Sequence, residues 1–262
     1  MAASQDGETL LSVDNVSVRF GGIVALDGVS FTVRRGTIVG LIGPNGAGKT
    51  TLFNCLSRLY HAASGDILFM GRSLLREPRH RIARLGIGRT FQNLALFPRM
   101  SVLENVMVGM HCQTHGDFVS QALRLPAALR EEAQIRRVAL ETVDFLGLGG
   151  VMNLPAAGLP FGTLKRVEMA RALACQPKLL LLDEPAGGLN HEEVSELASV
   201  IRNLKAERQV TVLLVEHHMQ LVMQVSDKVV ALNFGRVMHE GTPAQVQNDP
   251  EVVRAYLGSD AA

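Results

Sequence analysis

Several kinds of feature are scarce in this sequence of 262 residues, and their absence narrows what the chain can do and where it is expected to act. Charge of one sign is not in excess, because 26 Lys and Arg balance 25 Asp and Glu and leave a formal net charge of +1. The overall charge therefore does not favour binding to nucleic acid or to an anionic membrane. Long apolar runs are missing, since none approaches the ~18 residues needed to cross a bilayer. Residues 1–10 have no basic segment followed by an apolar one, so we expect no secretory signal.

Cysteine is also rare. The three cysteines, Cys55, Cys112 and Cys175, show no paired spacing, which is typical of proteins from a reducing compartment. Cys55 falls in a segment expected to be helical. We interpret it as a small buried core residue rather than as a reactive thiol.

Apolar residues, by contrast, are plentiful and regularly spaced. They make up 47% of the chain, enough for one large domain or a domain with an extra lobe. Over the first seventy residues they alternate, as in half-buried antiparallel strands: Leu11, Val13, Val16, Val18, Phe20, Val29, Phe31 and Val33. Between about 94 and 158 the spacing becomes helical, with a capping box at Ser101 and Glu104. Later segments predict helices at 127–146, 164–174 and 190–206 and strands at 178–182, 210–215, 228–232 and 236–239.

The most informative segment is residues 43–50, G-P-N-G-A-G-K-T, which fits the phosphate-loop pattern. An apolar run at 38–42 precedes it, and Leu52, Phe53, Leu56 and Leu59 follow at the spacing of one helix face. In such a loop, glycines let backbone N–H groups point at phosphate oxygens, and the helix N-terminus adds positive potential. Lys49 can reach the β- and γ-phosphates, and the Thr50 hydroxyl can bind Mg²⁺.

A second signal is the apolar run 179–182, which ends in Asp183 and Glu184. It predicts a buried strand that presents two carboxylates at its carboxyl end, where open α/β sheets bind their ligands. Asp183 can hold Mg²⁺, and Glu184 can orient or deprotonate an attacking water. His217 follows another apolar run, so we expect it to reach the γ-phosphate. Adjacent side chains diverge, so His217 and His218 are not expected to bind one metal together.

Taken together, these residues resemble the ATP-binding subunit of ABC transporters, over nearly the whole chain. Residues 43–50 resemble its Walker A motif and residues 179–183 its Walker B motif. Gln92 matches the Q-loop, His217 the switch histidine, and Phe20 the aromatic residue that stacks on adenine. Residues 159–163 occupy the position of the signature motif, and residues 187–190 that of the D-loop. The subgroup resembled is the branched-chain amino-acid importer, through residues 89–92, 183–190, 215–217, 240–243 and 255–258.

The resemblance implies cofactors and roles for particular residues. ATP and Mg²⁺ are the expected cofactors. Glu184 is the expected general base, with His217 and Gln92 completing the catalytic set, and Thr50, Gln92 and Asp183 are the expected Mg²⁺ ligands. The expected ATP-binding residues are Phe20, Gly43, Pro44, Asn45, Gly46, Ala47, Gly48, Lys49, Thr50, Thr51, Gly162 and Thr163.

The signature motif departs from the family pattern. Pro160 replaces its serine, Phe161 its first glycine and Thr163 its glutamine. In the family the serine hydroxyl contacts the γ-phosphate bound to the opposite subunit, which a proline cannot do. What remains for that contact is Gly162, the N-terminus of a helix expected near Thr163, and the Thr163 hydroxyl. Asn190 stands where the general D-loop has an aspartate.

The fold class implied is α/β: a P-loop NTPase of ABC type with a mainly parallel sheet, an N-terminal antiparallel β region and an inserted helical subdomain. Residues 1–93 and 161–262 form the expected nucleotide-binding core, and residues 94–160 the insert. The implied function is ATP hydrolysis that energises import of a small polar solute, branched-chain amino acids first. A urea or amide importer, a lipid or polysaccharide exporter, and a nucleotide sensor without enzymatic activity stay open as alternatives. A soluble ABC protein of translation or DNA repair is disfavoured, because neither tandem cassettes nor a coiled-coil insert is present.

The implied partners are membrane permease subunits, a second ATPase subunit (the same chain or a different one), and indirectly a solute-binding protein. No nucleic acid is expected. The chain would lie in the cytoplasm, on the inner face of the membrane through the permease. We predict that residues 92–110 dock a permease helix through Phe97, Met100, Met107 and Met110, although Met107 suits the core equally well.

Overall fold

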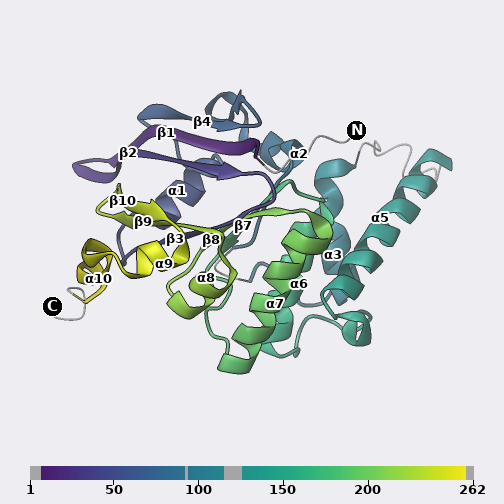
Figure 1. Cartoon of the computed structure of the whole chain (residues 1–262). Helices are drawn as coiled ribbons and strands as arrows, with labels where there is room; N and C mark the ends of the chain where they lie inside the picture. Colours follow the sequence, from purple (N-terminus) through teal and green to yellow (C-terminus); the bar gives the residue numbers. More distant parts are fainter. Residues whose placement is uncertain (1–6, 92–93, 115–125, 258–262) are drawn as a thin grey trace. The chain divides into compact units, whose positions relative to one another are not determined.

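The structure is a computed structural model that describes residues 7–91, 94–114 and 126–257 (Figure 1). The chain forms two compact units. One combines Met1–Ile82 with Lys178–Ala262, and the other is Ala83–Pro177. The boundaries expected from the sequence, 94 and 160, stay a prediction. In the part of the chain that the structure describes, no helix is both long and apolar enough to cross a membrane.

The first unit contains an antiparallel sheet in the order β2-β1-β4-β5. Its strands are β1 (Thr9–Phe20), β2 (Ile23–Arg34), β4 (Ser64–Phe69) and β5 (Arg72–Ser73). The buried positions of β1 change parity between Val13 and Val16, where the register with β2 shifts and Asn15 adopts a positive φ of 49°. A bulge therefore keeps the apolar side chains of both halves of β1 on the core face.

The same unit contains a mainly parallel sheet. Strands β3 (Ile38–Ile42), β7 (Leu179–Asp183) and β8 (Thr211–Val215) are buried along their whole length, as continuous apolar runs of a covered sheet are. β8 pairs in parallel with both β3 and β7, and β3 pairs in parallel with β9 (Lys228–Asn233). β10 (Arg236–Gly241) closes this edge as an antiparallel neighbour of β9. This arrangement confirms the expected fold class.

Helix α1 (Lys49–Leu56) contacts both sheets and lies between them in Figure 1. Leu52, Phe53 and Leu56 are buried, as predicted. The prediction that Leu59 extends this helix face is wrong, because the chain leaves the helix at Ser57, Arg58 takes a positive φ of 58°, and Leu59 is exposed. The remaining helices of this unit are α7 (His191–Arg208), α8 (Met219–Val225), α9 (Pro243–Gln247) and α10 (Pro250–Leu257), with 3₁₀ turns η1 (Leu74–Arg76) and η2 (Arg79–Arg81).

The second unit is mostly helical. Its main helices, α3 (Val102–Val108), α5 (Pro126–Phe145) and α6 (Phe161–Ala174), pack on one another. The capping box predicted at Ser101 is present, since the Glu104 N–H donates to the Ser101 hydroxyl and Glu104 accepts in return. Shorter elements are α2 (Ile82–Leu85), which begins at the last residue of the first unit, β6 (Ile87–Arg89), η3 (Gly109–Gln113) and η4 (Gly149–Val151).

The cysteines correct one expectation. Cys112 and Cys175 form a disulfide in this second unit, whereas the sequence indicated no pairing. The two cysteines are 63 residues apart, so no local spacing marks them as a pair. The packing of η3 against α6 brings their sulfur atoms together. Cys55 is free and buried, and burial raises the pKa of its thiol to about 11. That pKa keeps Cys55 protonated near neutral pH and fits the expected core role.

Candidate nucleotide-binding and hydrolysis site

The phosphate loop connects the carboxyl end of β3 to the N-terminus of α1. Two of its glycines are required by geometry. Gly43 has a φ of 152°, and a Cβ there would lie 2.2 Å from the Leu232 carbonyl oxygen of β9. Gly48 has a φ of 101° at the N-cap of α1, and a Cβ would lie 2.6 Å from the Ala25 carbonyl oxygen of β2. The loop is thus wedged between two strands in a shape that only glycine fits.

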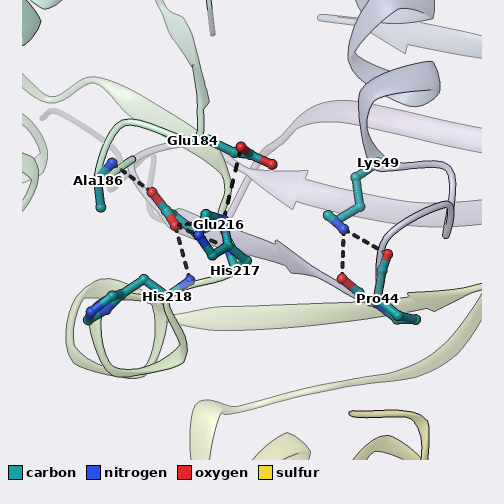
Figure 2. Close-up of polar contacts among 8 residues, drawn as sticks. Pro44, Lys49, Glu184, Ala186, Glu216, His217 and His218 are labelled. Atoms are coloured by element: carbon teal, nitrogen blue, oxygen red, sulfur yellow. Dashed lines mark hydrogen bonds and ion pairs between the residues drawn. The ribbon is translucent and has the colours of Figure 1, made fainter. Parts of the chain in front are cut away.

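Lys49 is folded back over this loop. Its Nζ donates to the Gly43 carbonyl at 2.6 Å and to the Pro44 carbonyl at 3.0 Å (Figure 2). Burial lowers the pKa of the ammonium, and the nearby Glu184 carboxylate partly offsets this by raising it. The loop therefore holds a buried lysine amine beside main-chain N–H groups at a helix N-terminus, the chemistry that suits an anionic phosphate.

The carboxylates predicted after β7 lie at the carboxyl end of this strand of the parallel sheet. Asp183 is buried as the last residue of β7. Glu184 follows with a positive φ of 48°, a conformation that costs a non-glycine residue energy and recurs at functional sites. Its N–H donates to the Val215 carbonyl of β8 at 2.9 Å, which holds it at the strand end.

The histidine predicted after β8 faces Glu184. His217 Nδ1 lies 4.0 Å from Glu184 Oε2 and 3.9 Å from Glu216 Oε2. Figure 2 shows this group on one side of the site and Lys49 on the other. A carboxylate able to accept a proton and an imidazole able to donate a hydrogen bond are therefore neighbours, as in-line phosphoryl transfer to water needs.

The predicted adenine-stacking residue, Phe20, is exposed at the end of β1. Its ring meets the ring of Tyr60 edge to face, with centroids 5.0 Å apart and planes at 73°. Edge-to-face contact is a favourable arrangement of two aromatic rings. The phosphate-loop residues Asn45, Gly46 and Thr50 are also exposed, Thr51 is half-buried and Ala47 is buried.

The signature residues lie in the second unit, at the start of α6. The helix begins at Phe161, two residues before the expected start at Thr163, with Pro160 at the N-cap. Proline at this position has no side-chain oxygen to accept a hydrogen bond from the first turn, and the first regular hydrogen bond of the helix runs from the Leu164 N–H to the Pro160 carbonyl. Gly162 is buried and Thr163 half-buried within the first turn.

Gln92 lies outside the described residues. The chain on both sides of residues 92–93 is fixed on α6: the Phe91 N–H donates to Glu168 at 2.8 Å, and the Arg171 guanidinium donates to the Ala95 carbonyl. Glu168 and Arg171 lie on α6, the helix that also carries the signature residues and that precedes β7, the strand ending in Asp183.

Sequence reasoning missed three residues that shape this site. Glu216 is buried between the loops that carry Glu184 and His217, and a signal for it existed, since an acid directly after an apolar strand is also what revealed Glu184. Tyr60 supports Phe20 from beyond α1. Gly235, in the turn between β9 and β10, donates its N–H to the Ala47 carbonyl at 3.1 Å. No local pattern marks Tyr60 or Gly235, because both act through contacts distant in sequence.

A phosphate loop after the central strand, with a carboxylate and a histidine at the ends of neighbouring strands, defines a P-loop nucleotide-binding protein. Comparison with known families is more specific. Residues 26–187 match the ABC transporter family, and residues 240–262 match the C-terminal model of the branched-chain amino acid ATP-binding cassette transporter. The chain belongs to the ABC transporter ATP-binding subunits.

Sequence and structural similarity to individual proteins supports this assignment. The chain is 41% identical to BraF of Pseudomonas aeruginosa, a high-affinity branched-chain amino acid transport ATP-binding protein, over 95% of this chain and 98% of BraF. It is 43% identical to LivG of Salmonella typhimurium, which bears the same description, over 96% of this chain and 98% of LivG. A crystal structure of an ABC-transporter cassette in its ADP conformation superimposes with a TM-score of 0.83 at 30% identity, over 96% of this chain and 99% of that one.

Proposed function

We propose that this chain is the ATP-hydrolysing subunit of a transporter that imports branched-chain amino acids through a separate membrane permease. The observation that carries the proposal is the placement of Lys49, Glu184 and His217 in one compact unit, around the carboxyl ends of β3, β7 and β8. The identification of the solute is based on the similarity to BraF and LivG and on the family match of residues 240–262.

The phosphate loop is proposed to hold the triphosphate. Backbone N–H groups of Gly46 and Gly48 and the Lys49 ammonium would contact its oxygens in place of the carbonyls that Lys49 now contacts. Mg²⁺ fits the hydroxyl of Thr50, the carboxylate of Asp183 and the amide of Gln92, because all three offer the hard oxygen ligands that it prefers. When bound, Mg²⁺ neutralises charge on the phosphate oxygens.

Glu184 is proposed as the general base. It accepts a proton from water as the water oxygen bonds to the γ-phosphorus, and the bond from that phosphorus to the bridging oxygen of ADP breaks. His217 donates a hydrogen bond to the γ-phosphate oxygens as charge develops on them. The products are ADP and inorganic phosphate.

A second ATPase subunit is proposed to complete the site through its own signature residues. The first turn of α6 offers backbone N–H groups at Gly162 and Thr163, and the Thr163 hydroxyl, to nucleotide bound on the opposite subunit. Because Pro160 contributes no hydroxyl, this contact relies on the main chain more than in the general family pattern.

A permease helix is proposed to dock on the loop before α3. Phe97 and Met100 are 46% and 38% exposed, whereas Met110 is 3% exposed and belongs to the core rather than to this surface. Asn105, fully buried, fixes the loop: its Oδ1 accepts from the Phe97 N–H at 2.8 Å, and its Nδ2 lies within hydrogen-bonding distance of the Phe97, Met100 and Ser101 carbonyls. The main chain that carries these two exposed apolar side chains is thus anchored by Asn105. Docking there would place the chain at the inner face of the membrane.

The test is transport by the assembled system. The chain is reconstituted in vesicles with the permease subunits and the solute-binding protein that co-purify with it, and ATP is supplied on the side of this subunit. We expect ATP-dependent uptake of labelled leucine, isoleucine and valine, and no uptake of urea. Uptake of urea alone would contradict the assignment of branched-chain amino acids as the solute. ATP-driven export would contradict the assignment as an importer. Phosphate release no faster than without protein would contradict the ATPase activity.

A further inference from the structure

Glu216 is a buried carboxylate for which the proposed chemistry has no use. It follows β8 directly, precedes His217, and is 0% exposed. Removing a carboxylate from water is costly unless hydrogen bonds replace those of water. The contacts of Glu216 therefore indicate what its charge does.

Both carboxylate oxygens of Glu216 accept main-chain hydrogen bonds, and they come from two different loops (Figure 2). Oε1 accepts from the Ala186 N–H at 2.7 Å, in the loop after β7 that also carries Glu184. Oε2 accepts from the His217 and His218 N–H groups at 3.0 and 3.1 Å, in the loop after β8. Hydrogen bonds to an ionised acceptor are about twice as strong as neutral ones.

These contacts connect the two loops beyond the point where the strands stop pairing. The β7–β8 ladder ends at the pair Asp183 and Val215, and the Glu184 N–H still donates to the Val215 carbonyl. Beyond this point, the Glu216 side chain connects Ala186 in one loop to His217 and His218 in the other. It thereby limits how far the backbone of His217 can move from that of Ala186 and, through Ala186, from Glu184.

We infer that Glu216 is a positioning residue that holds the His217 loop in register with the Glu184 loop for ATP hydrolysis. It does not touch the reacting atoms; it acts through its contacts with His217, whose Nδ1 also lies 3.9 Å from Glu216 Oε2, and with Ala186 in the Glu184 loop. The inference rests on the roles proposed above for Glu184 and His217. It predicts that chemistry, and not nucleotide binding, depends on the Glu216 carboxylate.

Glu216→Gln tests this in the full chain. The side chain keeps its shape, but its NH₂ group must face either the Ala186 N–H or the pair of N–H groups at His217 and His218. One loop therefore loses its acceptor. Misplacement of a catalytic group by an ångström costs roughly 100-fold, so we expect kcat for MgATP to fall about 10- to 100-fold. The KM for ATP should stay within about 2-fold of wild type, because the phosphate loop is untouched.

Asp227→Asn is the control, although Asp227, unlike Glu216, is part-exposed and its Oδ1 also pairs with the Lys205 Nζ at 2.6 Å. Asp227 Oδ2 accepts from the Ile38 N–H at 2.8 Å, at the opposite end of β3 from the phosphate loop. The same carboxylate-to-amide change there should lower thermal stability while leaving kcat unchanged for the folded protein. A merely structural Glu216 would behave like this control, so an equal effect of the two variants on kcat per folded molecule would overturn the inference.

Three further variants separate the possible outcomes. If Glu216→Gln does not fold, Glu216→Asp keeps the charge on a side chain one methylene shorter, and we expect reduced kcat at wild-type KM; wild-type kcat in that variant would overturn the inference. Glu184→Gln and His217→Ala are measured alongside. If both retain activity, the roles proposed for those residues fail. If they are inactive and folded Glu216→Gln is not impaired, only the positioning role fails.

Discussion

At the scale of single residues, Lys49 shows how the phosphate loop is prepared for an anion. Its ammonium is buried and satisfied by the Gly43 and Pro44 carbonyls, and its pKa is lowered by desolvation. A triphosphate offers that cation a full negative charge, which main-chain carbonyls do not. Binding of nucleotide should therefore draw Lys49 away from the loop.

We expect Lys49→Ala to abolish productive ATP binding. The variant removes the cation expected to meet the β- and γ-phosphates but leaves the glycine geometry of the loop in place. Equilibrium binding of ATP and release of phosphate are the measurements, with thermal unfolding to show that the chain folds. Normal nucleotide affinity and turnover would contradict the assignment of the loop.

Most of the residues proposed for nucleotide binding and hydrolysis were predictable because their signals are local. The phosphate loop is a contiguous motif, and Asp183, Glu184 and His217 each end an apolar run. Glu216 carries the same local signal as Glu184, an acid directly after an apolar strand, but its role was missed because only the pairing of β7 with β8 brings it to Ala186. Tyr60 and the Cys112–Cys175 disulfide were missed for the same reason, since both depend on contacts between distant segments.

At the scale of elements, the predictions that succeeded followed hydrophobic periodicity and capping. The predicted capping box at Ser101 marks the start of α3, and the helix predicted at 190–206 is confirmed as α7, with Asn190 at its N-cap. Helix ends were less predictable. α1 stops at Leu56 through a positive φ at Arg58, and α6 starts at Phe161 although its first turn carries a proline N-cap and a glycine. The end of α1 has no strong sequence signal, whereas Pro160 at the start of α6 is itself a helix-start signal that was not used.

The loop anchored by Asn105, which carries Phe97 and Met100, is the proposed docking site for the permease. A charge at Phe97 or Met100 should uncouple transport, because each side chain is exposed and apolar and lies in a loop fixed from beneath. We expect Phe97→Asp and Met100→Asp to bind ATP as wild type does but to lose co-purification with the permease. Val253→Asp is the control, since Val253 is equally apolar and exposed but lies on α10 in the other unit.

If both loop variants assemble and transport normally, the docking site is refuted. If they fail to fold, Phe97 and Met100 belong to the core of the helical unit instead. Loss of assembly in Val253→Asp as well would mean that the effect of the charge is not specific to the loop.

At the scale of the whole molecule, the unusual signature bears on association of two ATPase subunits. Pro160→Ser should tighten the ATP-dependent dimer if the missing hydroxyl matters, because one hydrogen bond to a charged group is worth roughly 1.5–3 kcal/mol, less any strain in the loop. Sedimentation with ATP, in a Glu184→Gln background that prevents turnover, measures the change. An unchanged or weaker dimer would show that α6 works here without the serine.

The ATPase activity of this chain is proposed to depend on Glu184 as the base. Glu184→Gln tests it most directly, because the amide keeps the shape of the side chain but is a far weaker base. We expect ATP binding to persist while phosphate release falls by roughly 10²–10⁴-fold, the usual contribution of a general base. Single-turnover phosphate release from a pre-formed complex with ATP and Mg²⁺ is the measurement. A wild-type rate in that assay would contradict the account and assign the base to another residue.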